Sequence, residues 1–179
     1  MRILIDTCVL YPTVMRQMVV GAAQAGAFAP LWSPRILEEW RRAAVKLGAA
    51  GQVQAEVEIA TLRAAMPQAE VEVPDGVHAR LWLPDDNDVH VLAAAVSASA
   101  DAIMTLNAKD FPRGVLAEEG LSRVDPDSYL LGVWQAQPQM IEKVAAQVHG
   151  EAERLSAAPW QMRALLKKAR LPRLAKALS

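Results

Sequence analysis

Two short apolar runs, each with polar side chains at its end, constrain the fold of this chain more than any other feature of its sequence. The first, at residues 2–5, leads into Asp6, and the second, at residues 102–105, ends in Thr105. Short runs of this kind are typical of strands that are buried on both faces. Helical patterns separate the two runs, and strands that alternate with helices form parallel sheets. The sequence therefore predicts an α/β fold with polar side chains at the carboxyl ends of its strands, where such folds gather their functional residues.

Apolar periodicity predicts the remaining elements. Residues 10–25 carry apolar side chains at every fourth position, as on one face of a helix. Ser33 and Pro34 are typical of the N-cap and the first position of a second helix, which runs to Gly48. Further helices are expected at residues 51–66, 89–99 and 113–119, and further strands at residues 70–73 and 122–124.

The last part of the sequence has a purely helical pattern. One amphipathic helix is expected up to about Gly150, Pro159 begins another, and Leu171-Pro172 interrupts it. Residues 135–138 are the best candidate for a linker. We therefore expect two parts, an α/β domain at residues 1–134 and a helical extension at residues 135–179.

Composition excludes several classes of protein. The 179 residues are 53% hydrophobic and 22% charged, which is typical of globular domains and not of disordered chains. No run of 18 apolar residues is available for a transmembrane span, and Asp6 comes too early for a secretory leader. Cys8 is the only cysteine, so an internal disulfide and a multi-cysteine zinc site are excluded. The simplest expectation is a cytoplasmic protein.

The net charge of −1 conceals a strong asymmetry. Residues 1–159 carry all 20 acidic residues and 13 basic ones, whereas residues 160–179 carry six basic residues and no acid. This balance of −7 followed by +6 indicates a terminal segment that contacts RNA or an acidic partner, although a solvated basic helix end has the same composition. The six basic residues are Arg163, Lys167, Lys168, Arg170, Arg173 and Lys176.

Acidic residues recur near the ends of the predicted strands and the starts of the predicted helices. Converging carboxylates repel one another unless a cation neutralises them, and Mg²⁺ and Mn²⁺ prefer such oxygen ligands. A metal held in this way activates water and polarises a phosphoryl oxygen, as hydrolysis of a phosphodiester requires. Spacing alone does not show that these residues converge. They are Asp6, Glu38, Glu39, Asp85, Asp86, Asp88 and Asp110.

Each acidic residue also has an interpretation that needs no function. Asp6 and Asp85 fit helix N-caps, Asp88 fits an interaction with a helix dipole, and Asp110 fits a turn. One of Glu38 and Glu39 must face solvent, because consecutive helical positions point about 100° apart.

The other residue types offer less chemistry. The sequence contains no glycine-rich phosphate loop and no serine-hydrolase elbow. Cys8 fits burial as a small hydrophobe, because no histidine near it in the sequence supports a nucleophile. Of the three histidines, His90 is the one that lies near an acidic cluster.

Four segments, in a fixed order, resemble the blocks of a known family. Residues 3–12 contain the first strand and Asp6, residues 32–40 contain a Leu-x-Glu step, and residues 83–95 form an acid-led, alanine-rich helix. Residues 101–112 contain the pattern Thr-x-Asn-x-x-Asp-Phe, which is the most specific of the four. By these segments the chain resembles PIN-domain ribonucleases, of the kind that act as the toxin in VapBC-type toxin–antitoxin pairs.

The resemblance implies a PIN-like three-layer α/β fold, with a central parallel sheet flanked by helices, and a C-terminal helical extension. It implies an endoribonuclease that uses Mg²⁺ or Mn²⁺ and leaves 5′-phosphate and 3′-hydroxyl ends. The partners it implies are RNA and a small DNA-binding antitoxin protein, and a homodimer stays open. The alternative is a non-catalytic PIN-like RNA-binding or regulatory protein. A phosphotransfer domain is a further option, but Cys8 stands where it needs a second acid.

By motif position, the resemblance assigns the catalytic roles to Asp6, Glu39, Asp88 and Asp110, and the metal to Asp6, Asp88 and Asp110. Thr105 and Asn107 are the supporting polar groups. Glu39 is preferred to Glu38 because the family pattern places the acid two residues after a leucine, here Leu37. Many members have asparagine in place of Cys8, so we expect a hydrogen bond from this position to be missing.

Overall fold

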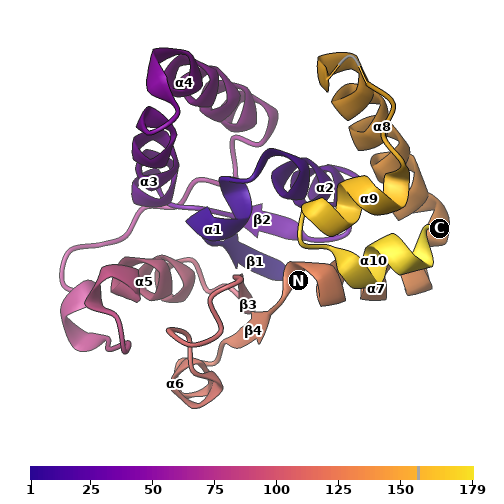
Figure 1. The fold of residues 1–179 in the computed structure, drawn as a ribbon. Coiled ribbons are helices and arrows are strands. Elements are labelled where there is room, and N and C mark those ends of the chain that lie inside the picture. The colour runs from indigo at the N-terminus through magenta and orange to yellow at the C-terminus, as the bar shows by residue number, and fades with distance from the viewer. Residues whose placement is uncertain (157) are drawn as a thin grey trace. The chain divides into compact units, whose positions relative to one another are not determined.

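The computed structural model describes residues 1–156 and 158–179, whose ribbon is shown in Figure 1. These residues form two compact units, each built from two segments of the chain. The sheet unit comprises Met1–Tyr11 and Ala29–Arg123, and the helical unit comprises Pro12–Phe28 and Val124–Ser179. The units are thus not divided at residue 134, since residues 12–28 and 124–134 group with the later helices. Where the functional domain ends stays a prediction.

Within the described residues, a four-stranded sheet forms the centre of the fold. Its order is β2 (Ala29–Leu31), β1 (Arg2–Ile5), β3 (Ala102–Met104) and β4 (Ser122–Val124). β1 runs parallel to β2 and to β3, with Leu4 opposite Leu31 on one side and Ile103 on the other. The sheet and its flanking helices confirm the predicted α/β class, and three of these strands lie where the sequence predicts them.

Two strands differ from the prediction. β2 is absent from the predicted elements because Pro30 indicates a helix stop, yet proline is tolerated in an edge strand and β2 lies at the edge of the sheet. The strand predicted at residues 70–73 is wrong, because Glu70 makes a single bridge with Trp32 and residues 71–73 are irregular. Four alternating residues are too few to specify a strand without a partner for their backbone groups.

The helices of the sheet unit place several polar residues at their starts. α3 (Pro34–Val45) begins at Ser33, whose Oγ accepts a hydrogen bond from the Ile36 N–H, as the N-cap pattern predicts. α4 (Gly48–Ala65) packs against α3, and α5 (Val89–Ser97) contacts β1 and β3. Every residue of α5 from Val89 to Ala95 is buried, which its short alanine side chains permit. The short elements are α1 (Thr7–Leu10), η1 (His78–Arg80), η2 (Asp86–Asp88) and α6 (Arg113–Glu118).

The single helix predicted at residues 10–25 is in fact two helices. α1 ends at Leu10, and α2 (Thr13–Gln24) begins after Pro12. Pro12 has an extended conformation and no N–H, so it separates the two helices. As a result α1 belongs to the sheet unit and α2 to the helical unit.

The helical unit is built from α2 and the helices that end the chain, α7 (Pro126–Ala136), α8 (Pro138–Ser156), α9 (Met162–Lys168) and α10 (Pro172–Ala177). α8 buries Val144 against α2, where Gly21 permits the close approach: a Cβ at Gly21 would lie 2.7 Å from Val144 Cγ1. Gln137 alone separates α7 from α8, so the predicted linker is a tight junction between helices. None of the helices described combines the length and the apolar character that crossing a membrane requires.

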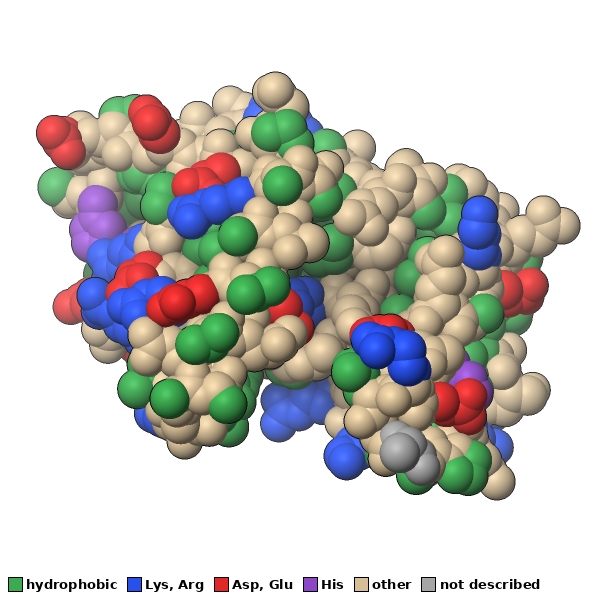
Figure 2. All heavy atoms as spheres, turned by 90° about the horizontal axis from the view of Figure 1, so that it is seen from above, with side chains coloured by type: hydrophobic (Ala, Val, Ile, Leu, Met, Phe, Trp, Pro, Cys, Tyr) green, Lys and Arg blue, Asp and Glu red, His purple; other side chains and the backbone are tan. Residues whose placement is uncertain are grey.

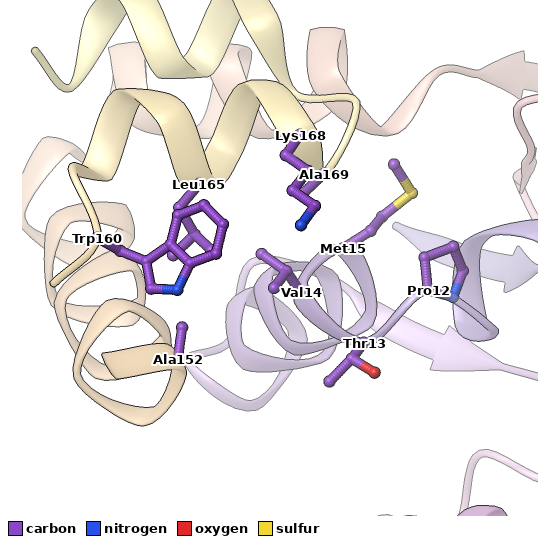
Figure 3. A pocket seen from close by; sticks show the side chains of 9 residues that line it. All are labelled: Pro12, Thr13, Val14, Met15, Ala152, Trp160, Leu165, Lys168 and Ala169. Atoms are coloured by element: carbon purple, nitrogen blue, oxygen red, sulfur yellow. The ribbon is translucent and has the colours of Figure 1, made fainter. Parts of the chain in front are cut away.

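A cavity of about 270 Å³ lies within the helical unit, between α2, α8 and α9 (Figure 3). Its walls are mainly apolar and include Val14, Ala152 and Leu165. The Nζ of Lys168 lies 5.0 Å from the centre of the Trp160 ring, which is a cation–π contact. One cation of the basic C-terminal segment therefore lies beside an aromatic ring at the wall of this cavity.

Asp127 attaches the last helix to α7. Its buried carboxylate accepts hydrogen bonds from the N–H groups of Arg173 and Leu174, each at 2.9 Å. These N–H groups lie in the first turn of α10, where a helix has no backbone acceptors of its own. Asp127 therefore acts as a helix cap supplied from another helix.

We expect Asp127→Ala to lower the free energy of unfolding by about 2–3 kcal/mol, because it leaves two helix N–H groups without an acceptor. Urea denaturation followed by circular dichroism measures the change. Asp125→Ala is the matched control, since Asp125 is the exposed N-cap of α7 and its loss should cost about 1 kcal/mol. An Asp127→Ala protein as stable as the Asp125→Ala protein would contradict this role.

Candidate functional site

The carboxyl end of β1 places Asp6 beside the end of β3. The Asp6 N–H donates to the carbonyl of Met104 at 3.0 Å, so the ends of the two central strands meet at this point. The Asp6 side chain is 7% exposed, and its Oδ2 accepts hydrogen bonds from Thr105 Oγ1 at 2.7 Å and from Cys8 Sγ at 3.0 Å. Asp6 stands at the N-cap of α1 but makes no side-chain capping bond, so capping does not account for it.

Cys8 acts as a hydrogen-bond donor at this site. Burial, followed by the negative charge of Asp6, raises the pKa of the Cys8 thiol to about 12. The thiol is therefore protonated at neutral pH and is not a nucleophile. A hydrogen bond from this position, which we expected to be missing, is made by the sulfur.

The polar segment after β3 holds two further carboxylates. The Asn107 N–H donates to Thr105 Oγ1 at 3.0 Å, which orders the turn that follows the strand. The side-chain amide of Asn107 donates to Asp110 Oδ2 at 2.7 Å and to Asp88 Oδ2 at 3.2 Å. One chain of hydrogen bonds therefore joins Asp6, Thr105, Asn107, Asp88 and Asp110.

A third carboxylate, that of Asp85, lies beside Asp88 and Asp110. One carboxylate oxygen from each of the three lies within 4.8 Å of the other two. Asp85 also accepts hydrogen bonds from the backbone and side-chain N–H groups of Asn87, both at 2.9 Å, and so caps η2 as the sequence predicts. The three carboxylates that lie this close together belong to Asp85, Asp88 and Asp110, whereas the predicted metal ligands are Asp6, Asp88 and Asp110.

The electrostatics of Asp88 fit a cation at this place. Burial, together with the charges of Asp6, Asp85 and Asp110, raises the pKa of Asp88 to about 6, and His90 opposes the shift. Neighbouring carboxylates that resist ionisation in this way are stabilised by a positive ion between them. The donors are all carboxylate oxygens, which are the ligands that Mg²⁺ and Mn²⁺ prefer.

Glu39 reaches the site through Thr7 and His90. Thr7 Oγ1 donates to Glu39 Oε2 at 2.9 Å, and His90 Nε2 lies 2.7 Å from Glu39 Oε1. Burial opposes ionisation of Glu39, but the hydrogen bonds from His90 and Thr7, together with the positive charges of His90 and Arg35, outweigh it and lower the pKa of this carboxyl. Glu39 is therefore an ionised carboxylate held next to Thr7, the residue that follows Asp6.

Glu38 has surroundings of a different kind. It lies 2.7 Å from Arg41 and 2.8 Å from Arg42, and their hydrogen bonds lower the pKa of Glu38 to about 2. Acidic and basic side chains lie side by side in this manner on the face of the molecule seen in Figure 2. The structure thus brings Glu39 toward Thr7 and leaves Glu38 in surface ion pairs.

Comparison with family models decides the class of the protein. The model described as the PIN domain matches residues 2–109, which are 108 of the 179 residues. The chain belongs to the PIN-domain family. PIN domains are generally metal-dependent nucleases, and PIN nucleases bind RNA. No curated protein and no solved structure matches the chain.

The PIN-domain match includes most of the residues described above. Asp6, Glu39, Asp88 and Asn107 lie inside it, and Asp110 follows its last residue directly. The predicted resemblance is therefore confirmed at the level of the family. The roles of single residues stay predictions, which the geometry supports by joining Asp6, Asp88 and Asp110 in one hydrogen-bond chain, while Glu39 is held separately by Thr7 and His90.

Three residues of this PIN-domain site are absent from the set that the resemblance assigns. Thr7 and His90 hold Glu39, and Asp85 lies against Asp88. The sequence signals for Thr7 and His90 are proximity, since Thr7 follows Asp6 and His90 comes two residues after Asp88, whereas Asp85 is one of the acidic residues noted in the sequence. Their contacts depend on how α3 and α5 pack beside β1, which local sequence does not report.

The basic C-terminal residues lie outside the PIN-domain match and belong to the helical unit. All six side chains are exposed. Among the residues that the structure describes, none of the six forms an ion pair. No acidic side chain of the described residues therefore neutralises them, and contact between these residues and a partner stays a prediction.

Metal binding by this PIN domain should depend on pH. We expect affinity for Mn²⁺ to fall as the pH drops below about 6, because Asp88 then takes up a proton that competes with the ion. In the metal-free protein the raised pKa means that the folded state binds the extra proton between about pH 4 and pH 6. Stability therefore falls as the pH rises through this window.

Thermal melts in EDTA and in Mn²⁺, recorded from about pH 4.5 to about pH 7.5, measure both effects. Asp88→Asn serves as the control, because it removes the titrating group. A stabilisation by Mn²⁺ that is equal at both ends of this range would contradict the prediction.

Proposed function

We propose that this PIN-domain protein is a metal-dependent endoribonuclease that hydrolyses RNA phosphodiester bonds, and that it is the toxin of a type II toxin–antitoxin pair in the cytoplasm. The observation that carries the nuclease proposal is the hydrogen-bond chain from Asp6 through Thr105 and Asn107 to Asp88 and Asp110. It gathers carboxylates from three separate parts of the sequence at the carboxyl ends of β1 and β3. A purely structural role gives no reason to place so much like charge together.

The donor set fits a divalent cation, Mg²⁺ or Mn²⁺. Asp6, Asp88 and Asp110 are the residues that would hold it, and Asp85 is close enough to two of them to contribute an oxygen. When bound, such an ion activates water for attack and polarises a phosphoryl oxygen.

The residues of the chain supply orientation and proton transfer. Thr105 and Cys8 both donate to Asp6 Oδ2, which sets the direction of this carboxylate. The Asn107 amide holds Asp88 and Asp110 together. Glu39, kept ionised by its two donors, orients the attacking water and accepts its proton. In-line attack on the phosphorus then leaves 5′-phosphate and 3′-hydroxyl ends.

Cleavage of mixed RNA in Mn²⁺ tests the nuclease proposal. We expect fragments with the wild-type protein in Mn²⁺, none in EDTA, and no cleavage above background with Asp6→Asn. Equal cleavage by the wild type and Asp6→Asn would overturn the assignment. RNA binding without cleavage would favour the alternative, a non-catalytic PIN-like protein.

Expression in growing cells tests the toxin role. We expect the wild-type chain to arrest growth, Asp6→Asn to leave growth unaffected, and co-expression of a small DNA-binding protein encoded beside this chain to restore growth. Absence of such a neighbouring gene would indicate a free-standing nuclease.

The basic segment at residues 160–179 is the proposed contact for the RNA backbone, because the acidic site itself repels phosphate. Deletion is a poor test, since Leu165, Leu166, Leu171 and Leu174 of this segment are buried. Glutamine at all six basic positions removes the charge and keeps these apolar side chains in place. We expect the slope of log affinity against log salt to flatten by about 0.7 for each phosphate that the protein no longer neutralises.

The matched control replaces exposed arginines elsewhere, Arg63, Arg80 and Arg154, each of which is already paired with a glutamate. These should leave the salt slope nearly unchanged. An unchanged slope in the six-glutamine protein would mean that the segment does not contact the RNA backbone, and would favour contact with an acidic protein partner.

A further inference from the structure

A cavity in the sheet unit has no part in the proposed mechanism. Its volume is about 270 Å³, and it lies between the start of α3, the buried helix α5 and the irregular segment that precedes η2. Pro34 and Arg35 contribute from α3, Val73 from the irregular segment, His78 from η1, and His90 and Ala93 from α5.

Two wall residues of this cavity contact the carboxylate of Glu39. His90 Nε2 lies 2.7 Å from Glu39 Oε1, and Arg35 Nε lies 3.8 Å from the same oxygen. The cavity therefore lies next to Glu39, the predicted general base, and two of its wall residues contact that carboxylate.

The walls match the chemistry of a nucleotide. Pro34, Val73 and Ala93 offer apolar surface for the face of a base, and no acidic residue lines the cavity among the residues described. Arg35 is 56% exposed at the side chain and offers a guanidinium to a phosphate. The carboxylate that contacts these walls, Glu39, is paired with Arg35 and His90.

His90 adds a polar group that has no protein partner. The His90 side chain is 7% exposed, and its Nε2 carries the proton that it donates to the Glu39 carboxylate. Among the described residues, Nδ1 is buried without a hydrogen bond. A buried polar atom of this kind is normally satisfied, so His90, which lines the cavity, carries an unmet hydrogen-bonding group.

We propose that this cavity binds one nucleotide of the RNA strand next to the scissile phosphate. The base lies against Pro34, Val73 and Ala93, and the phosphate lies at Arg35. The proposal rests on the proposed ribonuclease function, because it places the RNA beside Glu39. It adds a subsite that sets where the strand is cut relative to one bound base.

Binding in EDTA separates this proposal from the question of cleavage. A fluorescent single-stranded RNA oligonucleotide is prepared in versions that each carry one abasic residue, and anisotropy gives the affinity of each. We expect one abasic position to weaken binding by about tenfold, because the base no longer buries its face against the apolar walls, and to neighbour the site cut in Mn²⁺. Val73→Trp fills the cavity and should weaken binding of intact RNA to the same extent, with no further loss on the abasic version.

Arg35→Ala is the second variant, and it should flatten the salt slope by about 0.7. Arg42→Ala on the same helix is the control, since Arg42 is an exposed partner of Glu38 and does not line this cavity. Equal affinity for every abasic RNA, or undiminished binding by folded Val73→Trp, would overturn the subsite. Failure of the wild type to cleave in Mn²⁺ would instead overturn the ribonuclease function, whatever the binding data show.

Discussion

Replacement of Asp110 by asparagine should lower kcat for RNA cleavage by about 10²–10³-fold, the scale of loss when one preorganised electrostatic group, such as an oxyanion-hole donor, is removed. Asp110 accepts the Asn107 amide at 2.7 Å and has an oxygen within 4.8 Å of Asp85 and Asp88. Asparagine keeps the size of the side chain but removes one negative charge from the group. The loss should therefore appear in metal binding as well as in cleavage.

Asp86→Asn is the matched control for this substitution. Asp86 belongs to the same acidic run, but it lies outside the group of three close carboxylates. We expect Asp86→Asn to keep wild-type cleavage and the wild-type shift in melting temperature on addition of Mn²⁺, and Asp110→Asn to lose both. A larger loss in Asp86→Asn than in Asp110→Asn would place the metal elsewhere.

Features that depend on a few consecutive residues could be predicted from this sequence. Residues 2–5 form β1 because they combine apolar and β-branched side chains, and Ser33 caps α3 because its hydroxyl reaches the Ile36 N–H. The same local logic places Asp6 and Thr105 at strand ends. It does not bring them together: they are 99 residues apart, and the pairing of β1 with β3 makes their hydrogen bond.

Features that depend on packing between distant segments could not be predicted in this way. Asp85 is both a cap, as its sequence context indicates, and a neighbour of Asp88 and Asp110, which only the fold reveals. Pro30 suggests a chain break, but the edge of a sheet accepts it. Cys8 suggests a small buried hydrophobe, but its thiol donates to Asp6 because β1 and the segment after β3 enclose it.

The adjacent residues Glu38 and Glu39 provide the second test with a large expected effect. We expect Glu39→Gln to lower kcat by about 10²-fold, the usual scale for loss of a general base, and to change KM little. Glu38→Gln should change kcat by less than about twofold, because exposed ion pairs contribute little. Single-turnover cleavage of one defined RNA in Mn²⁺ measures both variants, and melting temperatures in EDTA show that both are folded.

The geometry around Glu39 explains why this loss reports on charge and not on a broken hydrogen bond. Glutamine has one oxygen for the two donors, Thr7 Oγ1 and His90 Nε2. Thr7 can turn its hydroxyl to accept from the new amide, and it already has a second acceptor in the Ile36 carbonyl at 3.3 Å. The glutamine therefore keeps its place but has no negative charge with which to take a proton from water. Equal loss in the two variants would mean that α3 does not present Glu39 to the site, and the proton acceptor would then have to be sought among the aspartates.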